Sequence, residues 1–226
     1  MGLDIINDNP KFLSEWINRE KSKEQLYNES HPNSLIPKFE DELRALGLNF
    51  EISNQLLGYM PRQKKTILPI AIKYYQKAKQ ENFPDEQNHF LQFFHYKGLD
   101  SVVPMLIADY KAKTTSELTR WMISDCLYQI RSRDFLNEYI DIVSIPQYGI
   151  NRQMLVLLLG KLKDAAAVPV LISLLDDHDV SLQAISALSE YRSPELRIYF
   201  ERFISSKQPA LKKAAISAVK RIDTKK

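Results

Sequence analysis

The chain has 226 residues, and its 31 basic and 28 acidic side chains give a net charge of only +3. This near balance does not demand a polyanionic partner, although it allows a local basic face, because the electrostatic field depends on where charges sit. The single cysteine, Cys126, excludes an intrachain disulfide framework and any multi-thiolate metal site. The start of the chain lacks the pattern of a signal peptide, and its apolar runs are shorter than the ~20 residues that span a bilayer. We therefore expect a cytoplasmic protein without a membrane segment.

The N-terminal third predicts helices without a clear repeat. Polar and apolar residues alternate at helical spacing in five segments, and Gly is scarce throughout the chain, with six in all. The predicted helices cover residues 10–28, 35–46, 52–59, 66–80 and 86–96. The last two also suit a divergent first repeat, because the terminal repeats of an array are atypical.

The remaining chain predicts repeated helical hairpins. Residues 103–107, Val-Pro-Met-Leu-Ile, read like residues 168–172, Val-Pro-Val-Leu-Ile, and each pair of such helices ends in a polar turn. The second helices share apolar residues at i, i+3, i+4 and i+7, with offsets of 32, 29 and 31 residues between successive copies. These apolar stripes are Ile123, Cys126, Leu127 and Ile130; Leu155, Leu158, Leu159 and Leu162; Ala184, Ala187, Leu188 and Tyr191; and Ala215, Ala218, Val219 and Ile222.

A period of about 30 residues with two helices per repeat is typical of a solenoid. One such pair cannot bury its own stripe, so neighbouring pairs must stack to close the core. We predict an all-α fold with a helical N-terminal cap over residues 1–60. Residues 61–226 are expected to form a solenoid of about four to five helical hairpins.

Residues 167–180 and 184–188 resemble the HEAT repeat, especially the short form of the phycobilisome-lyase-like bacterial group. The resemblance covers residues 98–223 and implies a right-handed α–α superhelix; it specifies function poorly. It also implies an Arg near the start of each second helix that pairs with turn carboxylates. The residues at that position are Arg120, Arg152, Ser181 and Lys212, so the ladder is expected to break at Ser181. The glycine that the family places late in the second helix is kept only as Gly160.

No catalytic or metal-binding motif stands out. His89 and His95 are six residues apart and lack the i, i+4 spacing of a helical metal pair. Residues 176–179, Asp-Asp-His-Asp, suit a turn in which Asp179 caps the next helix. Cys126 lies on an apolar stripe and is expected to be a small buried side chain. We therefore expect no enzyme activity, catalytic residue, metal or cofactor.

Trp121 and Asp125 lie four residues apart on a predicted second helix, beside Arg120. In HEAT-like solenoids the second helices typically line the concave side, where this trio is placed to contact a ligand. HEAT-like alkyl-purine DNA glycosylases are similar in using a Trp and an Asp at this spacing, but their additional tryptophans are not evident here. A half-buried Trp between repeats, beside a solvated Asp, explains the same pattern.

We expect a non-catalytic scaffold or adaptor that binds a protein or peptide on its concave face. The candidate contact residues are Arg120, Trp121, Asp125, Arg152 and Lys212. Arg120, Arg152 and Lys212 predict a basic ridge that meets acidic or phosphate-bearing groups. The alternative is a nucleic-acid-binding protein, with or without glycosylase-like activity, that uses the same ridge. A third hypothesis, an accessory to a lyase or modifying enzyme, rests on the family resemblance alone.

Overall fold

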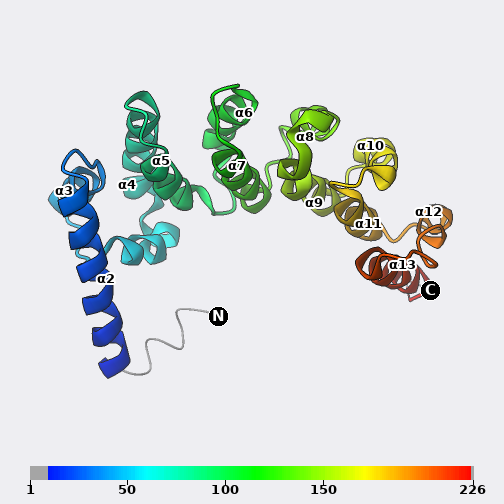
Figure 1. The fold of residues 1–226 in the computed structure, drawn as a ribbon, viewed down its shortest axis with the longest axis horizontal. Coiled ribbons are helices and arrows are strands. Elements are labelled where there is room, and N and C mark those ends of the chain that lie inside the picture. Colours follow the sequence, from blue (N-terminus) through cyan, green and yellow to red (C-terminus); the bar gives the residue numbers. More distant parts are fainter. Residues whose placement is uncertain (1–9, 225–226) are drawn as a thin grey trace. The chain divides into compact units, whose positions relative to one another are not determined.

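The computed structural model describes residues 10–224, and within them the chain forms twelve α-helices joined by turns and short 3₁₀ segments (Figure 1). No β-strand occurs in this range, which confirms the predicted all-α fold. None of the helices in residues 10–224 combines the length and apolar character that a bilayer crossing requires.

The chain divides into two compact units that meet between Phe93 and Phe94. The division predicted after residue 60 falls inside one long helix, near a kink at Gln63. A domain boundary at residue 60 stays a prediction.

The first unit contains four α-helices between residues 10 and 93. These are α2 (Pro10–Ser30), α3 (Ile36–Ala45), α4 (Ser53–Gln80) and α5 (Pro84–Leu91). Two separate helices were expected over residues 52–59 and 66–80, but α4 runs through both and leaves helical geometry only at Gln63 (φ −112°, ψ 20°). Pro61 has no N–H to donate, and its ring clashes with the preceding turn, so a kink at this point does not require a new helix.

An aromatic cluster forms the core of the first unit. The ring of Phe39 on α3 contacts Tyr74 of α4 edge-on at 5.6 Å and both Phe90 and Phe93 at 5.1 Å between centroids. His89 packs edge-on against Phe90 at 5.3 Å. Phe39, Tyr74, Phe90 and Phe93 are all buried, and their contacts tie α3, α4 and α5 together.

The second unit is built from four helical hairpins. They are α6 (Val103–Lys111) with α7 (Glu117–Ile130), α8 (Leu136–Val143) with α9 (Gln153–Leu162), α10 (Val168–Ser173) with α11 (Ser181–Ser189), and α12 (Arg197–Glu201) with α13 (Pro209–Asp223). The second helices, α7, α9, α11 and α13, pack against one another in chain order. In Figure 1 they form one layer of the unit, and the first helices form the other.

The predicted apolar stripes are the interior of this unit. All sixteen stripe residues are buried except Tyr191 and Val219, which are half-buried. The chain leaves α7, α9 and α11 through left-handed residues, Arg131, Lys163 and Arg192, at φ of 58°, 53° and 50°. Their spacings of 32 and 29 residues equal those of the stripes. Sequence and backbone therefore repeat in the same register.

Gly160 marks the closest approach between two second helices. A Cβ atom added there would lie 2.5 Å from Ala187 Cα and 2.8 Å from Ala187 Cβ on α11. Backbone cannot yield as a flexible side chain would, so α9 and α11 are held at a distance that only glycine allows.

We predict that Gly160→Ala lowers the free energy of unfolding by about 1–3 kcal/mol, because the added methyl group forces α9 and α11 apart. Urea unfolding followed by circular dichroism measures this change. Gly58→Ala on α4 is the matched control, since a Cβ there meets nothing within 4 Å. That variant should gain about 0.5–1 kcal/mol from helix propensity. A Gly160→Ala protein as stable as Gly58→Ala would contradict the close packing.

We predict that the stability of the first unit falls as the pH drops from about 6.5 towards 4. Burial lowers the pKa of His89 from 6.5 to about 4, so the unfolded chain takes up a proton that the folded unit excludes. The loss over this window is at most about 3 kcal/mol. Unfolding of the wild type and of His89→Gln is measured at several pH values. Identical pH dependence in the two proteins would refute this account.

Candidate functional site

Helix α7 presents an open stripe on the outside of the second-helix layer. Leu118, Trp121, Asp125 and Tyr128 follow the spacing of one helix face. Leu118 and Trp121 are 59% and 42% exposed, while Asp125 and Tyr128 are half-buried. Two large apolar side chains are therefore exposed to solvent near the start of α7. The stripe becomes more polar towards the C-terminal end of the helix.

The same face continues across α9, α11 and α13 as a shallow depression of about 270 Å³, which we call the furrow. Its uncharged lining consists of Tyr128, Leu157, Ser186, Ala187, Ser189, Ala214 and Ser217, and Lys161, Glu190 and Arg221 supply its charges. Most of the uncharged lining residues are Ser or Ala, whose small side chains leave space in the furrow for side chains of a second molecule.

The charges of the furrow centre on one carboxylate. Glu190 lies 3.0 Å from Lys161 Nζ, 3.5 Å from Arg221 Nη1 and 3.9 Å from Lys163 Nζ. Burial alone raises the pKa of Glu190, but the hydrogen bond and charge of Lys161, with Arg221 and Lys163, lower it overall. One anion shared by three cations leaves this end of the face positive.

Arg120 does not point towards a ligand. Its Nε donates to the Tyr110 carbonyl at 2.9 Å and its Nη2 donates to the Ala112 carbonyl at 3.1 Å, both at the end of α6. The guanidinium also lies over the ring of Tyr148 from the next hairpin, at 5.4 Å from the centroid. Arg120 therefore joins two hairpins.

Arg152 is buried, with 1% of its surface exposed. Its Nε and Nη1 donate to the carbonyls of Gly149 and Val143 at 3.0 and 3.1 Å. Its Nη2 lies 2.8 Å from Asp177 Oδ2 and 3.7 Å from Asp179 Oδ2, in the turn of the following repeat. The ladder of Arg and turn carboxylates implied by the HEAT resemblance is present here. Arg152 was expected to face a partner, but in this structure it is buried and its guanidinium contacts neighbouring segments of its own chain.

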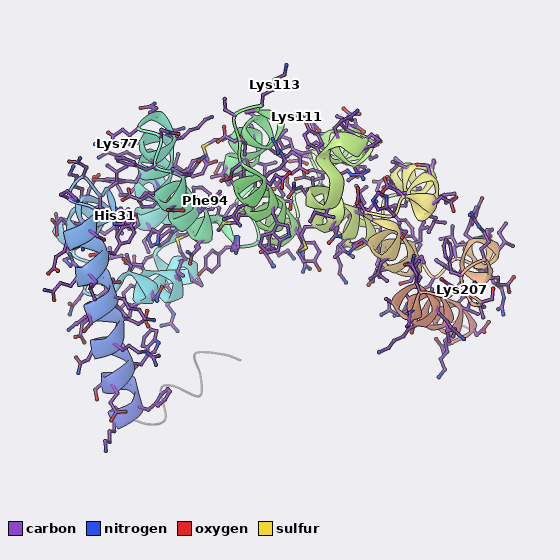
Figure 2. The ribbon with its side chains drawn as sticks, viewed as in Figure 1. His31, Lys77, Phe94, Lys111, Lys113 and Lys207 are labelled. Carbon is purple, nitrogen blue, oxygen red and sulfur yellow. The ribbon has the colours of Figure 1, made fainter. Side chains whose placement is uncertain are left out.

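The predicted basic ridge is therefore not continuous. Lys212 is exposed on α13, but Arg120 and Arg152 are turned into the fold. The last hairpin has exposed basic residues of its own: Lys212, Lys213 and Lys220 on α13, and Lys207, labelled in Figure 2, in the connection before it.

Asp125 lies beside a histidine of its own chain. Its Oδ2 is 3.8 Å from His95 Nε2. Burial lowers the pKa of His95, and the charge of Asp125 only partly offsets that effect. Sequence spacing placed Trp121 and Asp125 together correctly but gave no sign of His95, which is 30 residues away along the chain.

The turn before α11 differs in detail from its prediction. Asp179 was expected to cap α11, but Val180 is the N-cap residue and no side chain caps the helix. Asp177 instead accepts the Asp179 N–H at 3.0 Å. Asp177, His178 and Asp179 are the only residues of the described chain grouped closely enough to suggest a metal, and Arg152 already pairs with both carboxylates.

Cys126 fulfils its prediction as a small side chain of the core. The residue is fully buried, and burial raises the pKa of its thiol well above the usual value. A thiol in this state is a poor nucleophile.

The comparison with protein families agrees with the repeat register. Residues 140–220 match the family model for HEAT repeats, from within α8 to within α13. This match supports the resemblance to HEAT repeats that residues 167–180 and 184–188 indicated. HEAT repeats generally act as protein-interaction scaffolds and are typically non-catalytic. No curated protein matches the chain.

We predict that Arg152→Met destabilises the second unit by about 3–5 kcal/mol, since it leaves buried acceptors and Asp177 without their cation. Lys212→Met should change stability by less than about 0.5 kcal/mol, because its side chain is exposed. Urea unfolding of both variants tests the contrast. Equal stability of the two would show that Arg152 has no structural role.

Proposed function

We propose that this protein is a binding module that holds an acidic peptide segment. The segment would lie along the exposed face of α7, α9, α11 and α13, which comprises the α7 stripe and the furrow and which we call the second-helix face. The observation that carries the proposal is the open stripe of α7, where exposed Leu118 and Trp121 lead along one face to Tyr128 at the furrow. Tryptophan is enriched among residues that dominate binding energy, because it buries a large area at low entropic cost. Trp121 is the proposed anchor.

The furrow suits a peptide better than an enclosed small molecule. Its volume of about 270 Å³ is below the usual range for ligand cavities, and its lining comes from four separate helices. Small residues such as Ser186 and Ser217 leave room for the partner's side chains. A polar rim around a few apolar contacts is the common anatomy of a protein interface.

The charge of the face favours an acidic partner. Lys161, Lys163 and Arg221 share Glu190 alone, so negative groups on a partner gain from the remaining positive charge. Such charges mainly set specificity and the rate of association. Since exposed pairs contribute little stability, the network is free to rearrange when a partner binds.

Nucleic-acid binding is the weaker proposal. A protein that tracks a phosphate backbone needs several cations along its contact surface. Here Arg120 and Arg152 serve the fold, and the cations at the furrow, Lys161, Lys163 and Arg221, already share Glu190. Trp121 and Asp125 share a helix face, but Asp125 lies next to His95.

A displayed peptide library selected on the immobilised protein tests the proposal. Acidic sequences with an apolar residue should be enriched, and Trp121→Ala should weaken their binding at least tenfold, the loss typical of an interface anchor. Ile198→Ala is the matched control, because Ile198 is a 63% exposed apolar residue on α12, in the other layer. Fluorescence anisotropy of a labelled selected peptide measures each affinity.

Two results would contradict the proposal. One is selection of basic peptides, or of peptides that bind Trp121→Ala as well as wild type. The other is salt-dependent binding of duplex DNA that Trp121→Ala weakens, together with an absence of peptide enrichment. The second result would favour the nucleic-acid alternative.

A further inference from the structure

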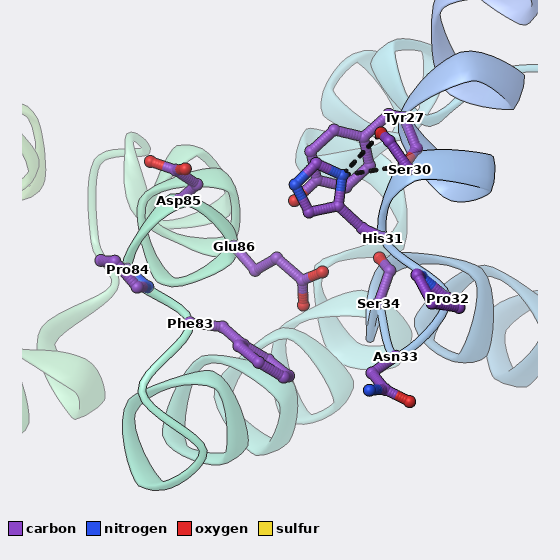
Figure 3. Close-up of a pocket in the computed structure, with 10 residues that line it drawn as sticks. All are labelled: Tyr27, Ser30, His31, Pro32, Asn33, Ser34, Phe83, Pro84, Asp85 and Glu86. Atoms are coloured by element: carbon purple, nitrogen blue, oxygen red, sulfur yellow. Dashed lines mark hydrogen bonds between the residues drawn. The ribbon is translucent and has the colours of Figure 1, made fainter.

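The first unit contains two adjoining pockets. One, of about 300 Å³, lies between the ends of α2 and α4 and the starts of α3 and α5, and Figure 3 shows its lining. In this view the Glu86 side chain reaches across the space towards Ser34 and Tyr27. Glu86 is 3% exposed, and its carboxylate accepts the Leu35 N–H at 2.9 Å. This first pocket therefore has a fixed, buried carboxylate in its wall.

The second pocket, of about 360 Å³, shares Tyr27 and Asp85 with the first. Glu24 of α2, Glu40 of α3 and His89 of α5 also line it. The two pockets form one acidic region that lies wholly within the first unit and does not depend on the function proposed above.

Only some of these carboxylates have a cation nearby. Glu40 pairs with Arg44 at 3.0 Å, and Glu20 pairs with Lys23 at 2.7 Å. Glu24 accepts one hydrogen bond, from the Ser53 N–H at 2.8 Å, and no cation pairs with Glu24 or Asp85 among residues 10–224. The second pocket thus retains two acidic groups that form no ion pair in the described chain: Glu24, on which the nearby charge of Arg44 acts, and Asp85, which is exposed near the start of α5.

The imidazole of His89 also lines the second pocket. Its Nε2 is buried and has no hydrogen-bond partner in the described chain. Burial lowers the pKa of His89 to about 4, so the ring is neutral at physiological pH and one nitrogen can accept a hydrogen bond. Buried polar atoms usually have hydrogen-bond partners, and this nitrogen remains able to accept a hydrogen bond from a donor in the pocket.

The pKa of Glu24, in the same pocket, is raised above its usual value. Burial is the largest effect and raises its pKa; the charges of Glu40 and Glu20 raise it further, while the hydrogen bond from Ser53 and the charge of Arg44 lower it by less. Its ionised form is therefore less favourable in the fold than in water, and a bound cation would stabilise it.

We propose that the second pocket binds a guanidinium or alkylammonium group, with Glu24 and Asp85 as anionic partners and His89 Nε2 as an acceptor. Both cations carry only hydrogen-bond donors and so complement these three groups. A compact metal ion fits less well, because no three His, Cys, Asp or Glu side chains of this pocket come within chelating distance in the described structure. The cation comes from a basic side chain of a partner protein or from a free polyamine.

Titrations of the full chain at constant ionic strength test this site. The probes are N-acetyl-arginine amide, N-acetyl-lysine amide and spermidine, and N-acetyl-citrulline amide is the neutral analogue. The NMR resonances of the His89 ring should shift saturably with the cations and not with citrulline. Tighter binding of spermidine would identify a polyamine as the source, and tighter binding of the arginine or lysine probe would identify a basic protein segment.

Substitutions of single carboxylates distinguish cation binding at this pocket from non-specific electrostatic attraction of the cation to the protein. Glu24→Gln and Asp85→Asn should each weaken cation binding at least tenfold, since each removes a charge-assisted hydrogen bond. Glu15→Gln, an exposed carboxylate on the same helix α2, should leave binding unchanged. Glu24→Gln keeps an oxygen that accepts the Ser53 N–H, so its thermal stability at pH 7 should equal or exceed that of wild type.

The proposal is overturned if no probe shifts the His89 ring saturably, or if citrulline binds as well as arginine. It is also overturned if Glu15→Gln weakens binding as much as Glu24→Gln does. None of these outcomes bears on peptide binding by the second-helix face, which is measured with separate ligands and variants.

Discussion

Each hairpin of the second unit has an apolar stripe that it cannot cover by itself. On α9, Leu155, Leu158 and Leu159 are fully buried, and α9 packs against α7 on one side and α11 on the other. Burying a leucine side chain is worth about 1.5–3 kcal/mol, so these contacts are the main stabilising interaction of the array. The approach of Gly160 to Ala187 shows how little separation the stacking leaves. The packing distance between successive second helices therefore fixes where the exposed residues of α7, α9, α11 and α13 lie relative to one another.

Packing between hairpins also decides which charges remain for binding. Arg120 and Arg152 both satisfy carbonyls at the ends of helices in the first layer, and both reach the next hairpin. The open face is therefore characterised by Trp121, small side chains and the cations around Glu190. That chemistry suits a peptide with acidic groups better than a continuous polyanion.

Much of the fold was predictable from sequence, because its signals are local or periodic. The apolar stripes gave the second helices, their register and the burial of Cys126, and the match over residues 140–220 supports the HEAT assignment. The direction of Arg152 was not predictable in the same way, since it depends on carbonyls and on Asp177 in another turn. The first-unit pockets were also missed: Glu24 and His89 are 65 residues apart, and only tertiary packing brings them to one pocket.

Hydroxyl-radical footprinting of the protein with and without a saturating acidic peptide reports on individual side chains, and so shows which layer of the second unit binds the peptide. The account predicts that Trp121, Tyr128 and Leu157 become protected, while Ile198 on α12 and Ile145 after α8 keep their reactivity. Protection of Ile198 and Ile145, with Trp121 and the furrow unchanged, would show that the second-helix face is not the binding surface.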